Sequence, residues 1–87
     1  MTPAEERDRI VLALDRAIDE AQALGKGNHD LFRELVAHCR EMHDILLAAM
    51  VRTPSLRTEA LAAYAATTRD QLQELELLAG VSTVSRH

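Results

Sequence analysis

Apolar residues recur along the chain at alternating spacings of three and four, the period of an amphipathic helix. Three such stripes follow one another, and no segment alternates with the period of a strand. The pattern therefore predicts an all-α fold. The stripes are Ile10, Val11, Leu14, Ala17, Ile18, Ala21 and Leu24; Phe32, Leu35, Val36, Cys39, Met42, Leu46 and Met50; and Leu61, Tyr64, Ala65, Thr68, Leu72, Leu75 and Ala79.

Capping signals at the ends of the stripes define the expected elements. Thr2 followed three residues later by Glu5 is a capping box for the first helix. Thr53 and Pro54 interrupt the second helix and supply a cap and a first turn for the third. The predicted helices cover residues about 3–24, 29–52 and 54–79.

The length of 87 residues fits one small domain, expected over 1–80, with 81–87 as a flexible tail. Two short connections between long helices imply antiparallel neighbours. We therefore expect an antiparallel three-helix up-down-up bundle with a narrow core.

The second helix ends in an apolar run, Ile45–Val51, which is hydrophobic on every side. Such a helix is normally buried on every side, and three helices cannot cover all of it. Exposed leucines scattered singly are one explanation. The other is self-association, and it predicts a homodimer whose interface contains Ile45, Leu47, Val51 and Leu77.

Composition and charge exclude several classes of function. The chain is 47% hydrophobic and carries a net charge of −4, which argues against binding nucleic acid through phosphates. Its single cysteine, Cys39, cannot form an internal disulfide, which suits a reducing compartment. The apolar run is far too short for a membrane span, and the first residues do not resemble a secretory signal. We expect a cytoplasmic protein without a membrane or nucleic-acid partner.

Cys39 and His43 are the strongest candidates for a metal or catalytic site. They lie four residues apart and share a helix face, but His38 lies on another face. A structural zinc site needs four ligands, and the other helices supply no Cys or His. A cysteine within an apolar stripe is ordinarily a small hydrophobe. We therefore expect no enzyme, no metal and no cofactor.

Charge is concentrated at one end of the expected bundle, where the first helix ends, the second begins and the third ends. Eight acidic and four basic residues belong to that end. Asp15 and Asp19 are like charges one turn apart, and Glu74 and Glu76 lie at the unfavourable end of the helix dipole. Local rules broken in this way indicate a binding surface, although a solvated acidic face is the alternative.

The segments Met1–Glu5, Asp8–Leu14 and Leu61–Ala65 resemble the small helical immunity proteins of bacterial type VI secretion toxins. The resemblance implies an intracellular helical bundle that binds and blocks a toxin. Flagellar and type III export chaperones, with an apolar groove for a partner helix, and phage-encoded inhibitors of host defence share this profile. All three classes act by binding a protein.

The sequence thus predicts a non-catalytic module that neutralises or occludes a protein partner with a basic surface. An export or secretion chaperone and a phage-encoded inhibitor are the alternatives. Replacing Asp15 and Asp19 with lysine is expected to abolish binding with little change in thermal stability. The predicted partner-binding residues are Leu12, Asp15, Asp19, Glu20, Asp70, Glu74 and Glu76.

Overall fold

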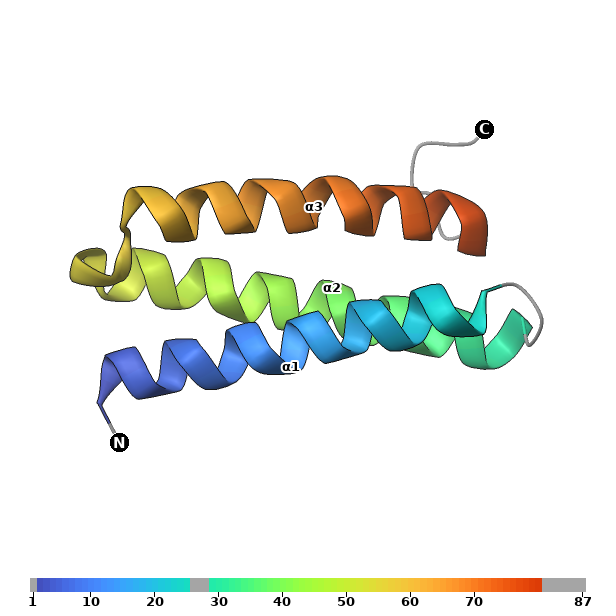
Figure 1. Ribbon diagram of the computed structural model, residues 1–87, viewed down its shortest axis with the longest axis horizontal. Coiled ribbons are helices and arrows are strands. Elements are labelled where there is room, and N and C mark those ends of the chain that lie inside the picture. Colours follow the sequence, from blue (N-terminus) through green and yellow to red (C-terminus); the bar gives the residue numbers. More distant parts are fainter. Residues whose placement is uncertain (1, 26–28, 81–87) are drawn as a thin grey trace.

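The computed structural model describes residues 2–25 and 29–80, and in these ranges it is all helical. The α-helices lie side by side along the long axis of a molecule measuring 39 × 26 × 18 Å (Figure 1). The prediction of an all-α fold is confirmed, whereas the predicted tail over 81–87 lies outside the described residues. The elements are α1 (Pro3–Leu24), α2 (His29–Arg52), the short 3-10 helix η1 (Pro54–Leu56) and α3 (Glu59–Ala79).

The two ends of the molecule differ in which helix termini they contain. At one end, which we call the Gly25 end, α1 and α3 finish and α2 begins (Figure 1). At the other, the Thr53 end, α1 and α3 begin and α2 finishes. An ion pair of 3.4 Å between Glu6 and Arg52 joins α1 to α2 at the Thr53 end. Both side chains are exposed, so this pair contributes little stability.

The predicted caps of α1 are present. The Thr2 hydroxyl accepts a hydrogen bond of 3.1 Å from the Glu5 amide, and the Glu5 carboxylate accepts one of 2.9 Å from the Thr2 amide. Gly25 and Gly80 follow α1 and α3 with φ of 59° and 71°, values that glycine adopts without steric cost. These signals place the ends of α1 and the end of α3 where the sequence predicted them.

The predicted start of the third helix at 54 is wrong. Pro54 begins a separate 3-10 turn, and α3 starts only at Glu59. Thr53 makes no side-chain cap, whereas the Thr58 hydroxyl accepts a hydrogen bond of 3.1 Å from the Leu61 amide. Leu56 is 6% exposed, so burying this side chain favours a turn between the two helices.

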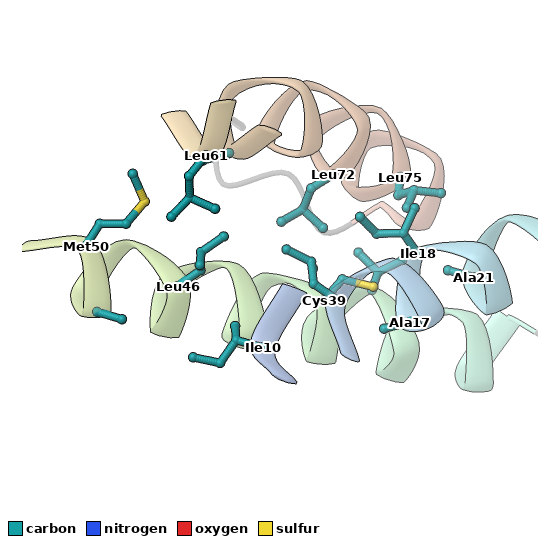
Figure 2. Close-up of a cluster of buried hydrophobic side chains, with 14 of the residues drawn as sticks. Ile10, Ala17, Ile18, Ala21, Cys39, Leu46, Met50, Leu61, Leu72 and Leu75 are labelled. Atoms are coloured by element: carbon teal, nitrogen blue, oxygen red, sulfur yellow. The ribbon is translucent and has the colours of Figure 1, made fainter. Parts of the chain in front are cut away.

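The core consists of the three apolar stripes together with Ala49 and Leu56. Most stripe residues are buried, and their side chains meet between the helices in Figure 2. Phe32, Leu14, Leu46 and Leu72 are large side chains with no exposed surface. The stripe residues at the margins are only partly buried: Val11, Leu24, Leu35, Met42 and Tyr64.

Hydrogen bonds join α3 to α2 in addition to the apolar packing. The Arg40 guanidinium donates two hydrogen bonds, of 2.7 and 3.0 Å, to the Glu76 carboxylate. His43, only 1% exposed, has its Nε2 3.0 Å from the carbonyl oxygen of Ala65. A carbonyl oxygen only accepts, so Nε2 carries the proton. The buried Thr68 hydroxyl lies 3.1 Å from the same oxygen.

Candidate functional site

Seven large apolar side chains are exposed among the described residues, and the four predicted for a homodimer interface are dispersed over the molecule. Ile45 and Leu47 are two residues apart on α2, so they point about 160° away from each other. Val51 lies near the Thr53 end and Leu77 near the Gly25 end (Figure 1). The seven are Leu12, Leu31, Ile45, Leu47, Val51, Leu77 and Leu78.

We call the line along which α1 and α3 face each other the seam. Tyr64 closes this seam on the side nearer the Thr53 end. Its hydroxyl donates to the Asp15 carboxylate at 2.6 Å and lies 3.3 Å from the carbonyl oxygen of Val11. Burial, followed by the hydrogen bond and the charge of Asp15, raises the pKa of Tyr64 above its ordinary value. Asp15 therefore has a structural contact, and we now expect its replacement by lysine to reduce stability.

The same seam is open at the Gly25 end. A hollow of about 430 Å³ lies there between α1 and α3. Its α1 wall contains the small residues Ala21 and Gly25, and Phe32 of α2 lies at its base with no exposed surface. We call it the Gly25 groove. It is lined by Ala21, Gln22, Gly25, Phe32, Gln71, Glu74, Leu75, Leu77 and Leu78.

Three exposed carboxylates lie in or one turn from the helix faces that line this groove, and we call them the acidic rim: Asp19, Asp70 and Glu74. Glu74 lines the groove directly. Asp19 lies one turn after Asp15, which contacts α3, and three residues before Gln22, which lines the groove, so it shares their face. Asp70 lies one turn before Glu74. The described lining contains no lysine or arginine.

The other predicted partner-binding residues lie away from the groove. Glu76 is bound to Arg40 on the opposite side of α3, and its side chain is only 20% exposed. Glu20 lies two residues before Gln22, on another face of α1, where its charge helps to raise the pKa of Cys39. Leu12 is 54% exposed one turn nearer the Thr53 end than Asp15. The structure thus brings together only part of the predicted set.

Comparison of the chain with protein-family models, with curated proteins and with solved structures finds no match. The function of this surface must therefore be derived from its own residues.

The buried polar groups of α2 include Cys39 and His43. Burial, opposed by a backbone hydrogen bond and reinforced by the charge of Glu20, raises the pKa of the Cys39 thiol to about 11. The thiol is therefore protonated at neutral pH and is not a nucleophile. The described residues contain no group of three potential metal ligands, and none of the described helices could cross a bilayer. His43 Nδ1 is buried without a hydrogen-bond partner among the described residues.

Three groove residues escaped the sequence interpretation: Gln22, Gln71 and Leu78. Gln22 and Gln71 lie seven residues after Asp15 and Tyr64, so they occupy the corresponding positions two turns further along the seam. This spacing of seven residues could have predicted the two glutamines. It does so only when the side of each helix that faces the other is known.

Proposed function

We propose that the chain is a non-catalytic protein-binding module that occludes a partner with a basic surface, as an immunity-type inhibitor does. The observation that carries the proposal is the Gly25 groove, an apolar hollow whose described border is acidic. Apolar burial supplies affinity, and the carboxylates favour encounter with lysine and arginine side chains. The proposal takes the bundle as up-down-up, which the Glu6–Arg52 and Tyr64–Val11 contacts support.

Charge reversal at the rim tests this function. We expect Asp19→Lys with Glu74→Lys to weaken capture of the partner at least tenfold, mainly because association becomes slower. High salt should slow association of the wild type in the same way. The matched control is Glu34→Lys with Glu41→Lys, which reverses two exposed carboxylates of α2 and changes the net charge equally. Capture from a lysate of the source cells, followed by measured binding rates for the isolated partner, gives the comparison.

Two results would contradict the proposal. One is unchanged binding by the rim variant. The other is an equal loss in both variants, since binding would then follow net charge rather than this surface.

A chaperone for a partner helix is the second candidate, because six of the nine groove residues are apolar or glycine. Its binding is expected to depend hardly at all on salt, which separates it from the inhibitor. Self-association through the dispersed apolar residues stays a prediction, and light scattering at low and high salt checks it.

A further inference from the structure

The Gly25 groove lies between two helices, α1 and α3. α1 and α3 both pack on α2, and they are bonded to each other at the Thr53 side by Tyr64. Beyond that contact the α1 wall of the groove consists of Ala21, Gln22 and Gly25, two of which are small. Two helices packed on a third leave a furrow that a fourth helix fills in four-helix bundles.

From this geometry we infer that the Gly25 groove receives an amphipathic basic helix of the partner, which lies between α1 and α3 as a fourth helix. The inference rests on the proposed function and names the segment that is recognised. From Gln71 to Leu78, α3 rises about 10 Å along the groove, so about two turns of the incoming helix are in contact.

The groove and its rim specify the chemistry of this helix. Its apolar side chains, spaced three and four residues apart, face Phe32, Leu75 and Leu78 at the base and wall of the groove. Its lysines or arginines flank that stripe and meet Asp19 on α1 and Glu74 on α3. Leu78 is 50% exposed in the free chain, so it gains burial when the helix binds.

A second copy of this chain is the less favourable occupant. A twofold contact through the groove would bring the rim of one copy, Asp19, Asp70 and Glu74, towards the same rim of the other. Like charges at close range oppose association, whereas a basic helix neutralises them. Charge complementarity therefore selects a heterologous partner.

The test uses two synthetic peptides of about 14 residues that contain only leucine and lysine. In one, the leucines are spaced three and four apart; in the other, the same residues are scrambled. We expect the patterned peptide to bind the full chain at least tenfold more tightly by fluorescence anisotropy. Amide shifts in nuclear magnetic resonance spectra should concentrate at Gln22, Gln71 and Leu78.

A variant that closes the groove separates shape from charge. Gln71→Tyr with Gln22→Asp repeats, two turns along the seam, the pair that Tyr64 and Asp15 form. This variant is more acidic than the wild type, so simple charge attraction predicts equal or tighter peptide binding. Docking in the groove predicts at least a tenfold loss, with an unchanged or higher Tm. The rim variant Asp19→Lys with Glu74→Lys, altered only at exposed positions, should lose binding as well.

The outcomes distinguish this inference from the proposed function. Equal binding of the two peptides, or full binding by the groove-closing variant, overturns the docked helix. If the captured partner is lost by the rim variant but retained by the groove-closing variant, the proposed function stands and the docked helix fails. Amide shifts at the groove that depend on chain concentration without peptide would assign it to a second copy and overturn the inference.

Discussion

The seam between α1 and α3 is closed at the Thr53 side and open at the Gly25 end. On the closed side, Tyr64 reaches across to Val11 and Asp15. At the open end, the α1 wall consists of Ala21, Gln22 and Gly25, and a hollow of about 430 Å³ lies beside it. The difference teaches that the size of a few side chains along the seam decides whether two helices contact each other or leave a groove between them.

The largest effect is expected at the base of the open end. Phe32→Ala removes a side chain with no exposed surface, so the free energy of unfolding should fall by about 3–4 kcal/mol. Urea denaturation measures this change. The exposed Leu77→Ala is the control and should cost less than about 0.5 kcal/mol. A loss below about 1 kcal/mol for Phe32→Ala would mean that the open end contributes little to the core.

A pH titration tests the core that lies between the two ends of the seam. Burial raises the pKa of Cys39 from 9.0 to about 11, so the unfolded chain loses this proton at lower pH than the folded chain. The free energy of unfolding should therefore fall between pH 9 and 11, by about 2 kcal/mol from this thiol.

Denaturation of wild type and Cys39→Ala across that range checks the expected decrease. The variant should show a flatter alkaline decline. Part of the slope should persist, because the pKa of Tyr64 is also raised and acts in the same direction. Identical slopes for the two chains would contradict the assignment to Cys39.

The smallest effect is expected on the closed side. Tyr64→Phe keeps the ring and removes the hydroxyl that bonds to Asp15, so stability should fall by about 1 kcal/mol. Combining it with Asp15→Asn in a double-mutant cycle isolates the coupling of the pair. Additive losses would show that the two side chains do not cooperate across the seam.

Much of the fold could be predicted from the sequence, because helix periodicity and capping are local. The Thr2–Glu5 capping box and the spacings of three and four residues within each apolar stripe depend on residues about one turn apart. The start of α3 was misplaced because Thr53 and Thr58 both carry capping hydroxyls, and burial of Leu56 decides between them.

The site was predicted only in part, since it depends on which helix faces which. Glu74 lines the groove, but counting acidic residues could not show that Glu76 is bound to Arg40 or that Asp15 accepts a hydrogen bond from Tyr64. The groove is space between α1 and α3 that side chains do not fill. The apolar pattern of one helix cannot predict such a space, because it depends on how two helices face each other.

The bond between His43 and Ala65 has a consequence for how α3 is positioned along α2. The first half of α3 is rich in alanine, with Ala60, Ala62, Ala63, Ala65 and Ala66, and such small side chains offer similar contacts after a shift of one turn. Apolar contact has no direction, whereas a hydrogen bond from Nε2 to one carbonyl does. This bond, together with the two from Arg40 to Glu76, therefore disfavours sliding and keeps the two helices in one register.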